Sequence, residues 1–142
     1  MPTYLLDVNV LIALAWPTHV HHARAHAWLD GVDEWATTPV TESAFVRLST
    51  NRAVVGAAVP VAVAVSMLSA IRAAPGHRFL TDGASFADPS IDLSRVATSA
   101  QITDAHLVGL AAGARFVLAT MDEALTEMLA PADRRHVLLL PG

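Results

Sequence analysis

The chain has 142 residues, of which 54% are hydrophobic and 15% are charged, so it can bury a core and does not resemble a disordered chain. It contains no cysteine, which excludes disulfides, thiolate nucleophiles and cysteine-ligated metal sites. All nine basic residues are arginines, which excludes lysine-dependent chemistry, and the net charge of −4 argues against nonspecific nucleic-acid binding through a basic face.

The N-terminus combines an apolar strand with a carboxylate at its end. Thr3–Leu6 is a short apolar run and helical periodicity starts at Val10, so the run predicts a buried strand that leads into a helix. Asp7 then lies at the carboxyl end of the strand, the edge where open α/β sheets bind ligands. The N-terminus lacks the features of a secretory signal, so we expect a cytoplasmic protein.

A helix, a strand and another helix are expected next. Residues spaced at helical intervals predict a helix over Val20–Leu29. Glu34–Thr38 predicts a short strand. Thr38 and Pro39 are then the cap and the first residue of a helix that carries Glu42 in its early part.

The middle of the chain is the part whose function the sequence describes least clearly. Ala53–Ile71 carries no charge, which raises the alternative of a membrane span. The spacing of its apolar residues, and its small ones, favour a helix that begins near Pro60. Further short elements are expected: a strand at His77–Leu80, and turns at Asp82–Gly83 and Asp88–Ser90. We predict no specific role for residues 53–100.

The last third of the chain repeats the alternation of strands and helices. Thr103–Asp104 opens a helix, Arg115–Thr120 is the strongest strand pattern and leads into Asp122, and a last strand covers His136–Leu140. This alternation predicts an α/β fold, in which a central parallel sheet of four to five strands is covered by helices on both faces. We expect a single domain over residues 1–142.

Four carboxylates fall at strand ends or early in helices: Asp7, Glu42, Asp104 and Asp122. Such positions share one edge of a parallel sheet, so side chains far apart in sequence can converge there. Close carboxylates repel one another unless a cation compensates, and hard oxygen ligands suit Mg²⁺, with Mn²⁺ as a substitute. Two such ions roughly 3.5–4 Å apart would clamp the attacking and leaving oxygens of a phosphodiester displacement.

Each carboxylate also has a purely structural explanation. Asp104 is favourable in the first turn of a helix, and Glu42 fits a solvated helix face. Asp122 fits a capping box made by Thr120 and Glu123. Asp7 is the hardest to explain this way, because a buried carboxylate needs a partner. The metal-site hypothesis therefore depends on the set rather than on any one residue.

Four ordered motifs resemble those of PIN-domain ribonucleases, most closely the VapC-type toxins of bacterial toxin–antitoxin pairs. The motifs are Leu6–Ile12, Thr41–Leu48, Ile102–Leu107 and Leu118–Asp122. The resemblance implies a PIN fold and a magnesium-dependent endoribonuclease that cuts specific structured RNA, such as transfer or ribosomal RNA. It also implies a homodimer that is neutralised by a VapB-type antitoxin.

The resemblance also assigns roles to residues of this chain. The acids of the family's site match Asp7, Glu42, Asp104 and Asp122. Among them, Asp7 and Asp104 match the acids most directly associated with the metal. Asn9 and Thr120 match polar residues of the same pocket, where an amide or a hydroxyl can orient a carboxylate or a water.

Two other functions fit parts of the pattern. An aspartate-dependent phosphatase on a doubly wound sheet would use Asp7 as a covalent nucleophile. Such enzymes commonly need an essential lysine, or a second acid where this chain has Asn9. A noncatalytic binding module would use the carboxylates for electrostatics alone.

Other polar residues give weaker signals. His22 and His26 share a helix face and could ligate zinc, but no carboxylate has matching spacing. We expect them to be surface residues, with some histidines stacking against Trp28. His106 and Arg47 could assist the reaction or contact phosphate, and the sequence leaves both roles open.

Overall fold

The computed structural model describes all 142 residues and has a five-stranded sheet at its centre. The strands are β1 (Tyr4–Leu6), β2 (Trp35–Thr37), β3 (His77–Phe79), β4 (Val117–Thr120) and β5 (Val137–Leu139), arranged in the order β3-β2-β1-β4-β5. All neighbouring strands are parallel, and Leu5 pairs with Ala36 on one side and Leu118 on the other. The predicted α/β class and parallel sheet are confirmed.

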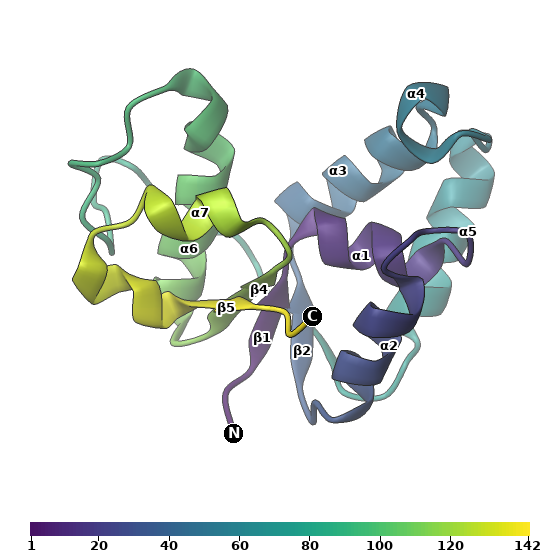
Figure 1. Ribbon diagram of the computed structural model, residues 1–142, viewed down its shortest axis with the longest axis horizontal. Helices are drawn as coiled ribbons and strands as arrows, with labels where there is room; N and C mark the ends of the chain where they lie inside the picture. The colour runs from purple at the N-terminus through teal and green to yellow at the C-terminus, as the bar shows by residue number, and fades with distance from the viewer.

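Helices cover both faces of this sheet (Figure 1). One face carries α1 (Val8–Ala15), α2 (His22–Asp30), α3 (Pro39–Ser49), the short α4 (Arg52–Val55) and α5 (Val61–Arg72). The other carries α6 (Ile102–Ala114), α7 (Glu123–Glu127) and the 3₁₀ turns η1 (Ser99–Gln101) and η2 (Pro131–His136). Successive strand residues face opposite sides, so Leu5 packs in the core beneath α6 and Leu6 in the core beneath α1.

The uncharged middle segment is helical only in part. Pro60 is the N-cap of α5, which confirms the predicted helix start. No helix here combines the length and the apolar character that crossing a membrane requires. No sequence pattern predicts α4, which Asn51 caps by accepting a hydrogen bond from the Ala53 amide at 3.0 Å.

The histidines of α2 close the end of α1. Rings of His22 and His26 hydrogen-bond to the carbonyls of Ala13 and Leu14 at 2.8 and 2.9 Å, satisfying acceptors that a helix end leaves unpaired. Trp28 packs against Tyr4, with ring centroids 5.2 Å apart. The predicted stacking of histidines on Trp28 is therefore wrong.

The C-terminal residues are tied to α2. The Arg24 guanidinium donates to the carbonyls of Leu140 and Pro141, the latter at 2.7 Å. The Leu140 amide donates to the Thr120 carbonyl at 2.9 Å, just beyond β5. The chain therefore ends at the same edge of the sheet where β4 ends.

Candidate functional site

Asp7 occupies the one position between β1 and α1 and is 5% exposed. Its Oδ1 accepts a hydrogen bond from the Val8 amide at 2.7 Å, which caps α1. Its Oδ2 accepts from the Thr120 hydroxyl at 2.7 Å. The strand-to-helix junction therefore holds a buried carboxylate at the carboxyl end of the sheet, as predicted from the sequence.

Thr120 and Asn9 link the ends of β1 and β4. The Asn9 amide group donates to Thr120 Oγ1 at 3.1 Å and lies 3.4 Å from Asp7 Oδ2, while its Oδ1 accepts from the Met121 amide. Thr120 Oγ1 also accepts from the Asp122 amide at 3.1 Å. We call this group of Asp7, Asn9, Thr120 and Asp122 the carboxylate edge.

Asp122 caps α7 at the carboxylate edge. Its Oδ1 accepts from the Ala124 amide at 3.0 Å, so Asp122 is the N-cap residue. The alternative capping box that begins at Thr120 is wrong, because the N-cap is Asp122 and the Thr120 oxygen accepts from Asn9 and the Asp122 amide rather than from Glu123.

Asp104 lies in the first turn of α6 and is half-buried. Its pKa is raised to about 6, first by burial and then by the negative charges of Asp7 and Asp122. The pKa of Asp7 is also raised, because burial and the Asp122 charge outweigh the hydrogen bonds from Thr120 and Val8. Three of the four predicted carboxylates are thus close enough to repel one another.

Glu42, in the first turn of α3, has different partners. It accepts a hydrogen bond from the Thr37 hydroxyl at 2.6 Å and lies 3.5 Å from Arg72. The Thr37 oxygen also lies 2.7 Å from His77 Nε2. Burial and the Arg72 charge lower the pKa of His77, which favours a neutral ring that donates to Thr37. Glu42 is not among the causes of the raised pKa values of Asp7 and Asp104.

The donor set matches a hard divalent cation in chemistry and in charge. Carboxylate oxygens that repel one another are stabilised when such a cation binds between them. No group of three or more histidine, aspartate or glutamate side chains is positioned to hold a metal ion in this structure. A shared site would need Asp104 and Asp122 to turn toward Asp7, which their partial exposure permits.

The sequence missed one pair of functional interest beside Asp104. His106 Nε2 lies 2.6 Å from Asp82 Oδ2, and Asp82 Oδ1 accepts from the Ala84 amide at 3.1 Å. The sequence predicts only a turn at Asp82–Gly83, because nothing in it indicates that Asp82 has a partner on α6. Arg47 is exposed and makes no side-chain hydrogen bond or ion pair within the chain.

Known proteins similar to this chain are ribonucleases. Ribonuclease VapC38 of Mycobacterium tuberculosis (strain ATCC 25618 / H37Rv) is 43% identical over 138 residues, which cover 96% of each chain. Ribonuclease VapC39 of the same strain is 44% identical over 128 residues, covering 88% of this chain and 92% of the relative. No protein-family model matches.

Two solved structures share the fold. The first is PAE2754 from Pyrobaculum aerophilum, with a TM-score of 0.60 and 23% identity over 90% of this chain and 80% of that one. The second is VapBC2 from Rickettsia felis, bound to a DNA fragment from their promoter, with a TM-score of 0.58 and 10% identity over 96% of both chains. At these identities the likeness concerns the fold alone.

Proposed function

Because the chain belongs to the family of VapC-type PIN-domain ribonucleases, we propose that it is an endoribonuclease toxin that hydrolyses phosphodiester bonds in structured RNA, such as transfer or ribosomal RNA. One PIN domain over residues 1–142 carries the activity. The observation that supports this most is the proximity of Asp7, Asp104 and Asp122, where burial first, and then the neighbouring negative charges, raise the pKa values of Asp7 and Asp104. Glu42 completes the proposed set of catalytic carboxylates.

The proposed cofactor is Mg²⁺, with Mn²⁺ as a substitute, held by these carboxylates. When bound, a divalent cation would supply positive charge beside the reacting phosphate and lower the pKa of an attacking water. Thr120 and Asn9 orient the Asp7 carboxylate through their hydrogen bonds. Because the pKa of Asp104 is raised to about 6, cation binding is expected to release a proton from it below that pH.

Asn9 also bears on the alternative of an aspartate-dependent phosphatase. Such an enzyme would need an acid at this position, whereas the Asn9 amide is bound to Thr120 and to the Met121 backbone. This arrangement supports an orienting role rather than proton transfer. The noncatalytic binding module makes a different prediction, which is that no RNA is cut.

The decisive experiment measures cleavage of total transfer and ribosomal RNA by the purified protein, with mapped RNA ends. We expect discrete cuts that require added Mg²⁺ or Mn²⁺ and disappear in excess chelator. Asp104→Asn should abolish the cuts, while the exposed control Asp30→Asn on α2 should retain them. Cleavage that survives Asp104→Asn, or that persists in excess chelator, would overturn the metal mechanism.

The proposed partners are a VapB-type antitoxin and a second copy of this chain. Support for a homodimer comes from two apolar side chains left exposed one helical turn apart on α5, those of Val61 and Val65. Water-exposed valines in such a group are typical of surfaces that another protein covers. Light scattering should give twice the chain mass, and Val61→Glu with Val65→Glu should restore the monomer if α5 is the interface.

A further inference from the structure

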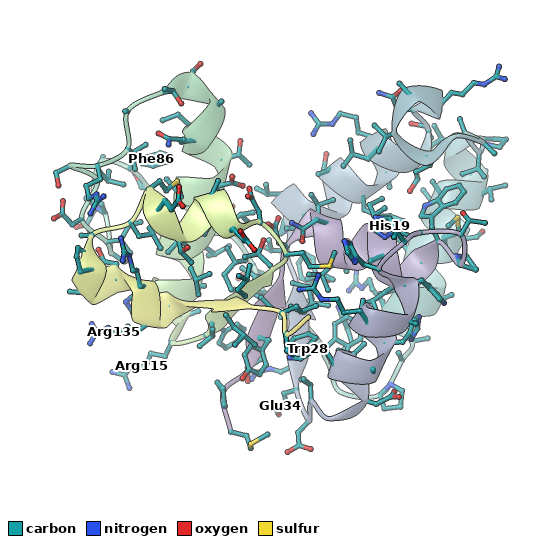
Figure 2. All side chains as sticks on the ribbon, viewed as in Figure 1. His19, Trp28, Glu34, Phe86, Arg115 and Arg135 are labelled. Atoms are coloured by element: carbon teal, nitrogen blue, oxygen red, sulfur yellow. The ribbon has the colours of Figure 1, made fainter.

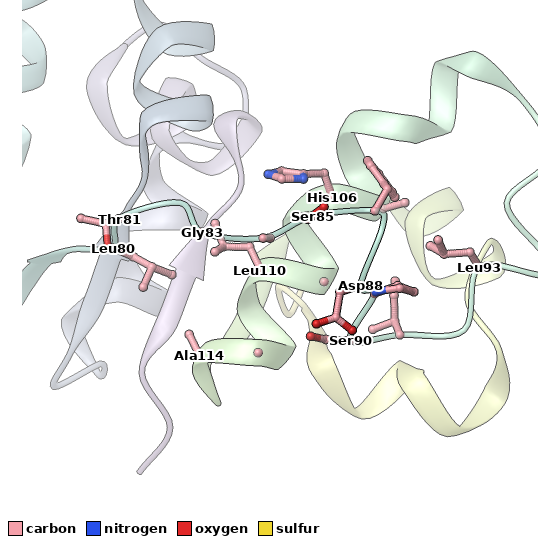
Figure 3. A pocket seen from close by; sticks show the side chains of 17 residues that line it. Leu80, Thr81, Gly83, Ser85, Asp88, Ser90, Leu93, His106, Leu110 and Ala114 are labelled. Carbon is pink, nitrogen blue, oxygen red and sulfur yellow. The ribbon is translucent and has the colours of Figure 1, made fainter.

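A cavity of about 380 Å³ separates α6 from the loop that follows β3 (Figure 3). The loop residues that line it lie between Leu80 and Leu93. We call it the α6 cavity. It is distinct from the carboxylate edge, because none of Asp7, Asn9, Thr120 or Asp122 lines it.

The α6 cavity is open because one helix face lacks large side chains. Ala105, Gly109 and Gly113 are spaced four residues apart and therefore share a face. A Cβ added at Gly109 would meet nothing within 4 Å, whereas one at Gly113 would lie 3.2 Å from Ser90 Oγ. The space above Gly109 can therefore accept a ligand, and Ser90 closes the cavity near Gly113.

Two anchors hold the loop near its ends, one to α6 and one to η2. Near its start, the Asp82 carboxylate accepts a hydrogen bond from the Ala84 amide and another from the His106 ring on α6. Near its end, the Asp92 amide donates to Asp133 Oδ2 at 2.8 Å. The loop is therefore tied to the body of the protein near both ends of the stretch that lines the cavity.

The lining combines an aromatic ring with free hydrogen-bond acceptors. Phe86 is 41% exposed, and its ring centroid lies 5.8 Å from that of His106. The Asp88 carboxylate makes no hydrogen bond or ion pair within the chain, and it lies beside Ser90 in the loop (Figure 3). Stacking surfaces with nearby polar groups are how proteins recognise unpaired bases.

The acceptors favour a particular kind of base. A carboxylate accepts hydrogen bonds from ring N–H and amino groups. Guanine presents two adjacent donors on its Watson–Crick edge, adenine and cytosine present one amino group each, and uracil places its N–H between two carbonyls. Asp88 should therefore accept guanine best and uracil worst.

The α6 cavity also adjoins the carboxylates. Asp104 precedes His106 by two residues, which is about 3 Å along the helix axis, and the two side chains leave the helix on different sides. The loop leaves the sheet at its carboxyl edge, where the Leu80 amide donates to the Thr37 carbonyl at 2.8 Å. Phe86 lies on this loop, far from His19 and the α1–α2 connection (Figure 2). A nucleotide chain that crosses the edge at Asp104 can thus reach the cavity.

We propose that the α6 cavity binds one unpaired base of the RNA substrate, with a preference for guanine. This inference rests on the proposed ribonuclease function and adds a specificity site to it. Phe86 would stack on the base, and Asp88 would accept its donors.

The first test measures binding without cleavage. Guanosine, adenosine, cytidine and uridine monophosphates, and inorganic phosphate, are titrated into the isotope-labelled full chain while the amide signals of Gly109 and Gly113 are followed by NMR. We expect guanosine monophosphate to shift these signals and to bind about tenfold more tightly than uridine monophosphate. Equal shifts with all four nucleotides, or shifts caused by phosphate alone, would overturn the proposal.

Matched variants test the site itself. Gly109→Leu fills the cavity and should abolish the shift of the Gly113 signal, whereas Gly109→Ala adds only one methyl group to open space. Asp88→Asn should remove the preference for guanine, while Asp30→Asn on α2 removes the same charge elsewhere and should keep it. Unchanged binding by Gly109→Leu would contradict the proposed location.

The second test uses RNA hairpins with a fully randomised loop and sequences the cleaved ends. Wild type should enrich guanine at a fixed distance from the cut, and Gly109→Leu should raise KM about tenfold with little change in kcat. If the wild type cuts no RNA, the proposed function fails. If it cuts, but with the same sequence preference as Gly109→Leu, only the cavity proposal fails.

Discussion

The carboxylate edge and the α6 cavity show how differently the same fold holds polar groups. At the carboxylate edge, Asp7 is fixed by a hydrogen bond from Thr120, at the end of a strand distant in sequence, and by one from the Val8 amide. At the α6 cavity, the carboxylate of Asp88 is exposed, in a loop tied near its two ends. A group that bridges strand ends is held in one geometry, whereas a group in a loop is held less tightly.

The largest expected effect comes from Asp7→Asn, which tests whether the carboxylate edge carries the chemistry. Asparagine also caps helices well, so α1 should remain folded. Loss of a metal-binding charge should lower the cleavage rate about 10³-fold. Rates with saturating Mg²⁺ and urea denaturation curves check this. A variant that folds and retains a tenth of the wild-type rate would remove Asp7 from the mechanism.

Thr120→Val tests whether the carboxylate edge is held by its central hydroxyl. The change leaves the buried Asp7 Oδ2 without its closest donor and the Asp122 amide without its acceptor. We expect the free energy of unfolding to fall by about 1–3 kcal/mol. Thr120→Ser keeps the hydroxyl and is the matched control. Equal stability of the valine and serine variants in urea denaturation would contradict this.

A pH series tests the repulsion among the carboxylates. Asp104 keeps a proton in the folded state up to a pH of about 6, whereas the unfolded chain releases it near 3.8, its usual pKa. Folding therefore loses stability as the pH rises through this window. The stability advantage of Asp104→Asn over wild type should therefore grow by about 1 kcal/mol between pH 5 and pH 7.5, a modest value because Asp104 is only half-buried.

Denaturation in urea at both pH values, without divalent cations, checks this prediction. Added Mg²⁺ should stabilise the wild type at pH 7.5 and reduce the advantage of Asp104→Asn. A stability difference that is the same at pH 5 and pH 7.5 would show that the Asp104 carboxyl is not perturbed.

The smallest expected effect is a difference in stability between the alanine variants of two glycines that line the α6 cavity. Gly109→Ala places a methyl group in open space and should gain roughly 0.5–1 kcal/mol from the better helix former. Gly113→Ala places its methyl group 3.2 Å from Ser90 Oγ, so Ser90 must shift and that gain should be reduced or lost. Thermal unfolding of both variants measures the difference. Identical gains would show that Ser90 does not pack against α6.

Sequence patterns predicted the parts of this molecule that depend on local periodicity. The apolar run before Asp7 predicted β1, the strand pattern before Met121 predicted β4, and Pro60 predicted the start of α5. The carboxyl ends of parallel strands lie at one edge of the sheet, so the predicted strands alone were enough to place Asp7 and Asp122 near each other. These predictions needed only spacing and the rules of parallel sheets.

Contacts between side chains from different elements could not be predicted in the same way. Glu42 bonds to Thr37 and faces Arg72 across helices whose relative position depends on packing. The Asp82–His106 pair joins residues 24 positions apart, through a loop whose path has no periodic signal. The α6 cavity arises from this path together with small residues that are unremarkable in the sequence.

The tie between Arg24 and the last carbonyls has a practical consequence for labelling. Gly142 follows β5 at the edge where β4 ends, whereas Met1 precedes β1 and lies at the opposite end of the sheet (Figure 1). A fluorophore on the C-terminus would lie near Thr120 and could report on the proposed RNA binding, while a bulky affinity tag there would obstruct the carboxylate edge. Purification tags therefore belong on the N-terminus.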